Sequence, residues 1–391
     1  MMCAKCGGAL GSVARFCWLC GTPVTVATMP LVRQPPVEPS SRRALFLGSG
    51  GVLVAIGLGI HFLRSQPKRL IVNAQGGGDY RTIASAILDA RPIDTIVVRP
   101  GTYLEALTID RDLRIVGEGG HSKVIVESAP GASVFTFTKG SATLTGLAIR
   151  VVGTDPIDGE GITSGITVAG GTPLIEDCDL TSSAGSTVYI YGETSNPTLR
   201  NCTIRDGKQS GVYVYGRGQG TILNCLIYGN THQGVHVRTG GNPVIRSCTI
   251  RDGKSSGVYV HEKGMGTIEK CVISGNTHPG VTIRTGGNPV IRDCAIRDGK
   301  ASGVFVYEQG QGTIEKCVIA ANANSGVQVR SGGNPVIRDC DIIDGKASGI
   351  FVYEQGQGTF TGNTLTGNAL GAWDIASTAE NVTRTGNNPN S

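Results

Sequence analysis

Apolar and polar residues alternate in short runs along most of this chain, with the two-residue period of β-strands. In the recurring pattern Gly-Val-x-Val, for example at 303–306, both valines face one side of a strand and the middle residue faces the other. Dipeptides that favour turns, such as Asp-Gly, Gly-Asn, Gly-Gly and Asn-Pro, separate the runs. The pattern therefore predicts many short strands joined by tight corners.

The strand runs recur at a fixed interval, which is clearest in a series of cysteines. The first gap in this series is 24 residues and the others are 23: Cys178, Cys202, Cys225, Cys248, Cys271, Cys294, Cys317 and Cys340. Asn-Pro recurs every 46 residues from Asn196 to Asn334, so alternate units differ. A period of this length is typical of a solenoid. The 59 glycines and the aromatic content of only 5% suit a coil with tight corners better than a layered core.

We therefore predict an all-β solenoid, a parallel β-helix with about 23 residues per coil and roughly a dozen coils over residues 70–375, followed by a tail at 376–391. Within it the cysteines form an inward row. They are expected to act as small apolar fillers, although adjacent thiols one coil apart are near enough for a disulfide to be considered. Asn363 takes the same place one period after Cys340, so the row accepts a polar residue and is not a string of metal ligands.

The first 23 residues have a different character. Cys3-x-x-Cys6 and Cys17-x-x-Cys20 supply four thiolates at the spacing of a tetrahedral zinc site, and a glycine follows each pair. A redox Cys-x-x-Cys is normally single and lies in a βαβ unit, so structural Zn²⁺ is favoured. The segment resembles the small zinc-ribbon at the N-terminus of many prokaryotic membrane proteins. Metal binding is expected to drive its folding.

Residues 24–43 are rich in proline and predict an extended linker. The next segment, 44–63, has 20 residues without a formal charge and basic residues on both flanks, which predicts one transmembrane helix. The flanking charges do not set its orientation. Because zinc thiolates require a reducing compartment, we expect a cytoplasmic zinc-ribbon and an extracytoplasmic β-helix. The protein would then be a single-pass membrane protein.

A helix is predicted at 79–91, with Asp79 as N-cap and Ile83, Ile87 and Ala90 on one face, where it closes the first coil of the solenoid. The stretch from Ile96-Val-Val-Arg-Pro-Gly-Thr-Tyr to Leu113-Arg-Ile-Val-Gly resembles the N-terminal segment of the pectin-lyase-like superfamily. The downstream catalytic signatures of its pectinesterases and polygalacturonases are not found in the sequence.

A second resemblance covers 172–368. The run Asp252-Gly-Lys-Ser-Ser-Gly-Val-Tyr-Val-His-Glu and the later Arg284-Thr-Gly-Gly-Asn-Pro resemble the β-helix of the F-box only protein 11 family. This resemblance implies a right-handed β-helix that binds proteins and has no enzymatic activity. The chain departs from that family because it has no F-box and has Cys where the family commonly has Asn, so ubiquitin ligation is not implied.

The outward positions of the Gly-Val-x-Val strands give a candidate binding surface. The middle position is occupied in turn by Tyr213, His236, Tyr259, Thr282, Phe305, Gln328 and Phe351. The position two residues later is occupied by Tyr215, Arg238, His261, Arg284, Tyr307, Arg330 and Tyr353. The predicted contact residues are the aromatic residues, arginines and His261 of these two series. Arginine beside aromatic rings is typical of contact surfaces, and the same rows also have a plausible role in stabilising an exposed sheet.

Carboxylates give a weaker catalytic signal. Two sets of carboxylates recur every second unit: Asp206, Asp252, Asp298 and Asp344, and Glu262, Glu308 and Glu354. Equivalent copies of a carboxylate indicate Asp-Gly turns and corners, because one active site needs groups in unequal environments. The non-repeating Asp155, Asp158 and Glu160 are a better catalytic candidate, and they are also candidate Ca²⁺ ligands or a solvated loop.

The charge of the chain argues against one class of partner. The net charge of +5 comes without a basic tract interleaved with aromatic residues, so nucleic acid is not an expected partner.

The main hypothesis is a membrane-anchored, non-catalytic scaffold that recognises a protein or a glycan through its repeats. The alternative is a polysaccharide lyase, epimerase or hydrolase, and a purely structural spacer is a third possibility.

Overall fold

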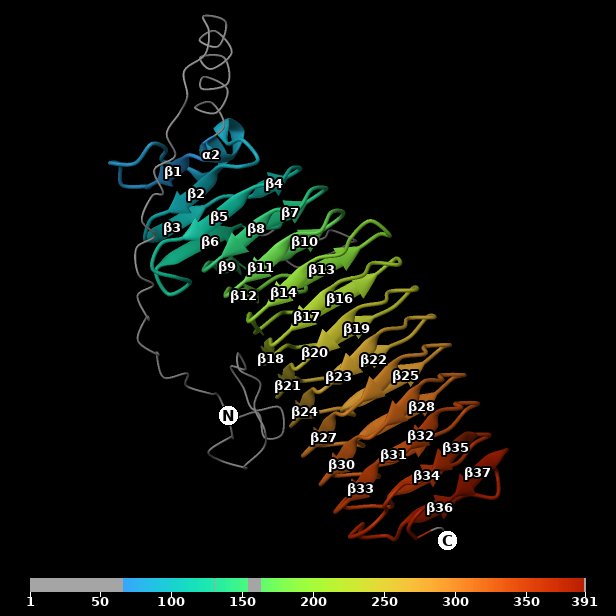
Figure 1. Cartoon of the computed structure of the whole chain (residues 1–391). Coiled ribbons are helices and arrows are strands. Elements are labelled where there is room, and N and C mark those ends of the chain that lie inside the picture. The colour runs from blue at the N-terminus through green and yellow to red at the C-terminus, as the bar shows by residue number, and fades with distance from the viewer. Residues whose placement is uncertain (1–65, 130, 154–162, 390–391) are drawn as a thin grey trace, which may run out of the picture.

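The computed structural model describes residues 66–129, 131–153 and 163–389, which form a parallel β-helix. Its coils stack along one axis from the N-terminal coil, which carries the short helix α2, to the C-terminal strands β36 and β37 (Figure 1). Each complete coil contributes one strand to each of three sheets, and all strand pairs between coils are parallel. The predicted all-β parallel β-helix is confirmed.

Sheet 1 has 14 strands in the described residues. In stacking order they are β1 (Arg69–Val72), β2 (Thr95–Val98), β5 (Arg114–Gly117), β8 (Thr143–Thr145), β11 (Leu174–Glu176), β14 (Thr198–Arg200), β17 (Thr221–Leu223), β20 (Val244–Arg246), β23 (Thr267–Glu269), β26 (Val290–Arg292), β29 (Thr313–Glu315), β32 (Val336–Arg338), β35 (Gly358–Thr361) and β37 (Val382–Thr385).

Sheet 2, which contains the Gly-Val-x-Val runs, has 12 described strands. They are β4 (Leu107–Ile109), β7 (Phe135–Phe137), β10 (Ile166–Val168), β13 (Val188–Tyr191), β16 (Val212–Tyr215), β19 (Val235–Val237), β22 (Val258–Val260), β25 (Val281–Arg284), β28 (Val304–Tyr307), β31 (Val327–Val329), β34 (Ile350–Val352) and β36 (Trp373–Ile375).

Sheet 3 has 11 described strands. They are β3 (Gly101–Leu104), β6 (Val124–Ser128), β9 (Ala148–Val151), β12 (Asp179–Ser182), β15 (Thr203–Arg205), β18 (Leu226–Tyr228), β21 (Thr249–Arg251), β24 (Val272–Ser274), β27 (Ala295–Arg297), β30 (Val318–Ala320) and β33 (Asp341–Ile343).

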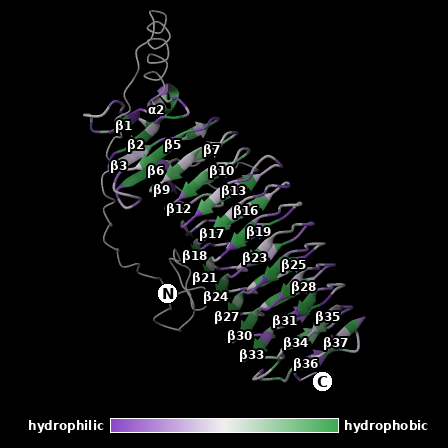
Figure 2. Ribbon diagram, viewed as in Figure 1, coloured by the Kyte–Doolittle hydropathy of each residue, from purple (hydrophilic) through white to green (hydrophobic). Residues whose placement is uncertain are grey.

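The core is a set of inward rows in which each side chain packs on its equivalent one coil away. Ile245, Ile268, Ile291 and Ile314 of sheet 1 are in register and almost completely buried. Along the solenoid, hydrophobic residues lie mainly in the strands and polar residues lie mainly at the corners (Figure 2). The glycine before each inward valine of sheet 2 is required by this packing, because a Cβ on Gly303 would lie 2.4 Å from the Ile319 side chain.

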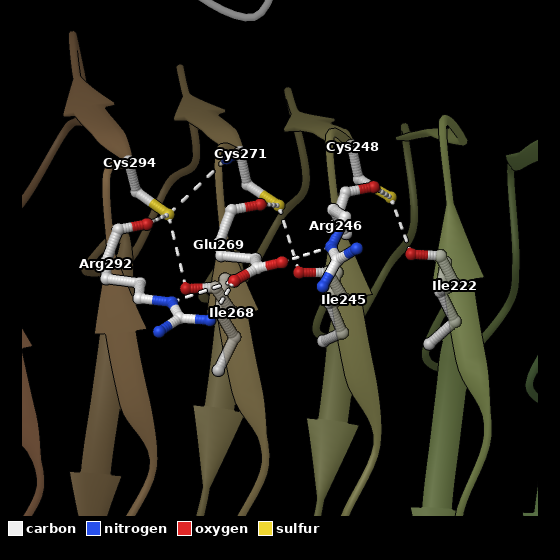
Figure 3. A network of polar contacts seen from close by, with 9 residues as sticks. All are labelled: Ile222, Ile245, Arg246, Cys248, Ile268, Glu269, Cys271, Arg292 and Cys294. Atoms are coloured by element: carbon white, nitrogen blue, oxygen red, sulfur yellow. Dashed lines mark hydrogen bonds and ion pairs between the residues drawn. The ribbon is translucent and has the colours of Figure 1, made fainter.

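The cysteine row is buried and its eight thiols are free, as predicted. Each thiol also makes weak hydrogen bonds. The Cys271 Sγ donates to the carbonyl oxygen of Ile245 on the preceding coil, at 3.6 Å, and the Cys294 Sγ accepts from the Cys271 N–H at 3.4 Å (Figure 3). Burial raises the pKa of the Cys271 and Cys294 thiols. The row therefore combines apolar filling with backbone hydrogen bonding, and its thiols are poor nucleophiles.

Asn363 explains why a polar residue is tolerated in the cysteine row. Its Oδ1 accepts from the Cys340 N–H at 3.0 Å and its Nδ2 donates to the Ile337 carbonyl at 3.0 Å. A cysteine sulfur in this row makes the same two hydrogen bonds, accepting from an N–H and donating to a carbonyl, but over longer distances. Asn387 repeats the arrangement below Asn363, so the solenoid continues past its predicted end at residue 375. β37 and Asn388, which forms a β-bridge with Thr364, lie in the stretch predicted to be a tail.

A second asparagine row, which the sequence analysis missed, supports the corners between sheets 3 and 2. The Oδ1 atoms of Asn230, Asn276, Asn322 and Asn368 each accept a backbone N–H from a glycine of the preceding coil, at 2.9–3.1 Å. These glycines follow Asp206, Asp252, Asp298 and Asp344, which have φ between 53° and 55°. The four aspartates thus occupy left-handed corner positions, as the Asp-Gly turns predicted.

The helix at the start of the solenoid is shorter than predicted. α2 spans Ile83–Asp89, and Thr82, not Asp79, is the N-cap, with its side chain accepting from the Ser85 N–H. The Glu105 carboxylate also accepts from the N–H groups of Ile83 and Ala84, whereas Asp79 accepts from the Ile71 N–H of β1. The buried face of Ile83 and Ile87 is as predicted.

The predicted zinc-ribbon (1–23), linker (24–43) and membrane span (44–63) all lie outside the described residues, as do Asp155, Asp158 and Glu160. Within the described stretches, no helix has the length and apolar character needed to cross a membrane.

The asparagine row gives a prediction about stability. Asn276→Ala leaves the Gly253 N–H and the Ile250 carbonyl buried without this partner, so we expect a loss of roughly 2–4 kcal/mol in the free energy of unfolding. Denaturant unfolding followed by circular dichroism measures the loss. The neighbouring Thr277→Ala, at an exposed side chain, is the control and should change stability by less than about 0.5 kcal/mol. Equal stability of both variants would contradict a structural role for the row.

Candidate functional site

The outward side chains of sheet 2 form two continuous rows. The first row is Tyr189, Tyr213, His236, Tyr259, Thr282, Phe305, Gln328 and Phe351, and the strand register places each member opposite the next. The second row is Tyr191, Tyr215, Arg238, His261, Arg284, Tyr307, Arg330 and Tyr353. The structure therefore brings together all the predicted contact residues on one face.

The rows begin one coil earlier than the sequence analysis proposed. Tyr189 and Tyr191 of β13 pair with Tyr213 and Tyr215 of β16. The signal was present in the run Val-Tyr-Ile-Tyr at 188–191, which matches 212–215, but the 24-residue gap in this unit obscured it. His236 was identified in the first row but was not among the proposed contact residues.

The rings of the two rows pack against one another. Tyr213, His236 and Tyr259 succeed each other along the axis with ring centroids 4.6 and 5.1 Å apart and interplanar angles of 18° and 29°. Phe351 and Tyr353 on one strand have centroids 4.3 Å apart. Because neighbouring rings occupy much of each other's faces, the polar ends of the rings, and not broad aromatic platforms, are the groups left for a ligand.

The arginines lie between these rings, as the sequence analysis predicted. The Arg284 guanidinium lies 5.6 Å from the Tyr259 centroid and 5.8 Å from the Tyr307 centroid, and Arg330 lies 5.6 Å from Tyr307 and 6.0 Å from Tyr353. Such cation–π contacts stabilise exposed sites by about 0.5–1 kcal/mol each. The rows therefore contribute to the stability of the sheet, whatever they bind.

Glutamates one coil further along neutralise the arginines of the second row. Arg238 pairs with Glu262 at 3.1 Å, Arg284 with Glu308 at 3.2 Å and Arg330 with Glu354 at 3.4 Å. The Thr239 hydroxyl donates to Glu262 and, with Arg238, lowers the pKa of this carboxyl. All three glutamates occupy corner positions with φ of 46–49°. The face thus presents hydrogen-bond donors and acceptors with little net charge.

The rows contain one place without a repeat, where two imidazoles meet. The Nε2 atoms of His236 and His261 are 2.8 Å apart while the ring centroids are 5.0 Å apart, so the rings join edge to edge through a hydrogen bond. The His261 Nδ1 lies 3.5 Å from Oε1 of Glu262, which favours a proton on that nitrogen. In this tautomer the His261 Nε2 accepts from His236, whose Nδ1 is then unprotonated.

Burial keeps this histidine pair neutral. It lowers the pKa of His236 to about 3 and also lowers the pKa of His261. His261 lies in the outward second row but is only 6% exposed, so it supports His236 and offers little surface of its own to a ligand. Tyr213 and Tyr259 flank His236, and burial raises the pKa of both hydroxyls, which remain protonated donors.

Sheet 1 carries a different pattern on its outer face. The Glu269 carboxylate lies between Arg246 and Arg292 (Figure 3). Glu315 pairs with Arg338 in the same way. Burial opposes ionisation of Glu269, but the two arginines outweigh it and lower its pKa. This alternation of charges along a sheet is self-compensating, and we assign it a structural role.

Metal sites were predicted only in stretches outside the described residues, at Cys3, Cys6, Cys17 and Cys20 for Zn²⁺ and at Asp155, Asp158 and Glu160 for Ca²⁺. Within the described part of the chain, no group of three or more His, Cys, Asp or Glu side chains is arranged to hold a metal ion. The candidate site is therefore the face of sheet 2 from β13 to β34.

Solved structures with a similar fold include polysaccharide-active enzymes. The A-module of the mannuronan C-5 epimerase AlgE6 from Azotobacter vinelandii has 18% identity and a TM-score of 0.59, and the match covers 78% of this chain and 92% of the module. The periplasmic alginate epimerase AlgG has 13% identity and a TM-score of 0.59, with 75% of this chain and 76% of that chain covered. The catalytic domain of a GH87 α-1,3-glucanase in complex with nigerose has 15% identity and a TM-score of 0.62, with 82% of this chain and 69% of that chain covered.

A search of curated proteins gave no match. At the identities above, the structural likeness establishes the fold alone. The sequence profile described as right handed beta helix region matches residues 134–267 and 233–388, which together span more than half of the chain. This match also supplies the handedness that the repeat period does not determine. The protein belongs to the family of right-handed β-helix region proteins.

Proposed function

We propose that this protein binds a polysaccharide, which lies along the two rows of sheet 2 between β13 and β34. The observation that carries the proposal is the regular ladder of polar groups, in which tyrosine hydroxyls, imidazole nitrogens and guanidinium groups recur in register on successive coils. Coils about 4.8 Å apart offer one set of groups per coil. A polymer of similar repeating units can use such a ladder over its length.

The chemistry of the face suits sugar hydroxyls. The ion pairs between Arg238 and Glu262 and between Arg284 and Glu308 present donors and acceptors side by side without a large net charge. Because the ring faces are occupied by neighbouring rings and arginines, recognition would rely on hydrogen bonds to ring substituents. The fold shared with a mannuronan epimerase and an α-1,3-glucanase supports a glycan ligand over a protein ligand.

A catalytic role on the same ligand is the second candidate, and the histidine pair favours it. The unprotonated Nδ1 of His236, whose partner His261 is oriented by a carboxylate, would accept a proton only once an anionic uronate bound beside it raises the low pKa of this imidazole. Arg238 and Arg284 lie near enough to influence His236 electrostatically, and cations of this kind stabilise negative charge that develops during proton abstraction. An epimerase or lyase acting on uronate residues requires such a proton transfer. The Asp155, Asp158 and Glu160 loop is retained as a candidate only from its sequence.

The remaining parts of the chain complete the proposal. Residues 44–63 would anchor the β-helix in a membrane, with the Cys3, Cys6, Cys17 and Cys20 zinc-ribbon in the cytoplasm and the β-helix outside. This arrangement would place the binding face where envelope polysaccharides are found.

The polysaccharide proposal predicts that hydroxyl groups, more than rings, determine affinity. Replacing Tyr191, Tyr215, Tyr307 and Tyr353 with Phe retains the ring packing and removes four donors. We expect Kd for the bound polysaccharide to rise roughly tenfold or more, since each hydrogen bond contributes modestly. Binding is measured by biolayer interferometry on immobilised α-1,3-glucan, polymannuronate, polygalacturonate and hyaluronan.

The matched control is Tyr228→Phe on sheet 3, where the ring packs under the Arg251 guanidinium at 4.9 Å. This variant should bind as the wild type does. Unchanged affinity in the four-residue variant, with folding intact by circular dichroism, would count against the proposed face. An absence of binding to every polymer in the wild type would argue against the function itself.

The catalytic candidate predicts solvent exchange at the sugar ring. Wild-type protein incubated with polymannuronate or polygalacturonate in D₂O should incorporate deuterium at C-5 or form unsaturated ends, as seen by NMR. His236→Gln should reduce the rate by roughly 10²-fold or more, as expected for loss of a general base. The exposed His278→Gln is the control. Equal rates in both variants, or no reaction in the wild type, would reject this candidate and leave the binding proposal intact.

The lowered pKa of His236 predicts a pH-dependent stability. Above pH 6.5 the imidazole is neutral in both the folded and the unfolded chain. As the pH falls from about 6.5 towards 3, only the unfolded chain gains this proton, so stability is lost across that range. Between pH 7 and 5, the wild type should lose roughly 1–2 kcal/mol more than His236→Gln. Urea unfolding at the two pH values measures this difference, and an identical pH dependence would show that His236 titrates normally.

A further inference from the structure

Four lysines form an exposed row at the corner between sheets 3 and 2. They are Lys208, Lys254, Lys300 and Lys346, which lie 46 residues apart, or two coils. Each follows an Asp-Gly turn at the same position of its coil. We call these four residues the lysine row.

The backbone beneath the lysine row is fixed by hydrogen bonds. The N–H groups of Lys254, Lys300 and Lys346 donate to the carbonyls of Asn230, Asn276 and Asn322, each at 3.0 Å. The glycine that precedes each lysine donates to the Oδ1 of the buried asparagine row, at 2.9–3.1 Å. The four lysines therefore extend from positions whose relative spacing is set by the solenoid and not by loop motion.

The coils between the lysines carry uncharged residues. Thr231, Thr277 and Ala323 donate their N–H groups to the carbonyls of Gly207, Gly253 and Gly299, which places them between successive lysines. The order along the axis is thus Lys208, Thr231, Lys254, Thr277, Lys300, Ala323 and Lys346. Positive charge recurs every second coil, at an interval of about 10 Å.

The lysine row differs from the arginines of the second row of sheet 2 because no carboxylate forms an ion pair with its side chains. Three of the four corner aspartates, Asp206, Asp252 and Asp298, pair with the arginines beside them in sequence, Arg205, Arg251 and Arg297, whereas Asp344 follows Ile343 and has no arginine beside it. The second-row arginines pair with glutamates. In the described part of the chain, none of the four lysine side chains forms an ion pair or a hydrogen bond with a carboxylate. The row is consequently available to an external anion.

We propose that the lysine row binds an acidic polysaccharide whose repeat is a disaccharide with one carboxylate or sulfate group. This inference rests on the proposed polysaccharide function and specifies the class of polymer. One anionic group per two sugars would meet one lysine per two coils, and the neutral sugars would lie over Thr231 and Thr277. The row lies at the corner that leads into sheet 2, five residues before the first row on the same coil, from Lys208 to Tyr213.

The first test measures binding of the full-length protein to three polymers. Hyaluronan carries one carboxylate per disaccharide, polygalacturonate carries one per sugar, and dextran is neutral. Lys208, Lys254, Lys300 and Lys346 are replaced together with Gln. The control variant replaces Lys123, Lys263, Lys270 and Lys316, which are exposed elsewhere and give the same change in net charge.

The lysine-row variant should raise Kd for hyaluronan roughly tenfold or more, because four exposed ion pairs are lost, and should weaken its dependence on salt. The control variant should change Kd by much less. Equal effects of the two variants would overturn the inference, because net charge alone would then explain binding. A different outcome is that the wild type and both variants bind dextran but not hyaluronan. This result would overturn the inference and leave the proposed function in place. If the wild type binds none of the polymers tested here or above, both fail.

A second variant tests the spacing directly. Thr231→Lys, Thr277→Lys and Ala323→Lys together place a lysine on every coil from Lys208 to Lys346. The ratio of hyaluronan to polygalacturonate affinity should fall at least several-fold, because the row then matches a polymer charged at every sugar. An unchanged ratio would overturn the proposed match between charge spacing and disaccharide repeat.

Discussion

The parallel hydrogen-bonded register between successive coils is the constraint on which the rest of this molecule depends. Because each strand pairs with its equivalent about 4.8 Å away, every side chain has a neighbour at the same position above and below it. A residue that packs well against its own kind is therefore favoured at that position throughout the solenoid. The buried isoleucine rows, the cysteine row and the outward rows of sheet 2 all follow from this one relation.

The same relation turns polar residues into continuous supports. Asn276 and Asn322 each contact the preceding coil twice, accepting from a glycine N–H and donating to an isoleucine carbonyl, so backbone groups at the corners are satisfied inside the solenoid. Cys271 and Cys294 make longer versions of the same contacts. Asn363 can therefore follow Cys340 in one row without disturbing the backbone, since amide and thiol fill equivalent hydrogen-bonding roles.

Charge is distributed over the faces according to whether it has a partner on the adjacent coil. On sheet 1, Glu269 lies between two arginines, and on sheet 2 each of Arg238, Arg284 and Arg330 faces a glutamate from the next coil. Like-charged residues two coils apart are far enough from one another to be tolerated. The lysine row has this spacing but has no such partners, which is why a repeating anionic polymer complements it. The lysine row lies at the corner that adjoins sheet 2 along the solenoid axis.

The sequence by itself determined the repeat, the inward and outward positions of the strands and the burial of the cysteines, because side-chain alternation and a constant period are local properties that stacking preserves. It also gave the membership of the two rows from Tyr213 to Tyr353. It did not determine that Thr82 and Glu105 cap α2, that His236 contacts His261 across a diagonal, or that His261 is buried, because these contacts join different coils through particular rotamers. The tertiary structure alone also decided which arginines form ion pairs with glutamates and that the lysines of the lysine row do not. The glutamate partners lie 23 or 24 residues away in sequence and meet the arginines only when the coils stack.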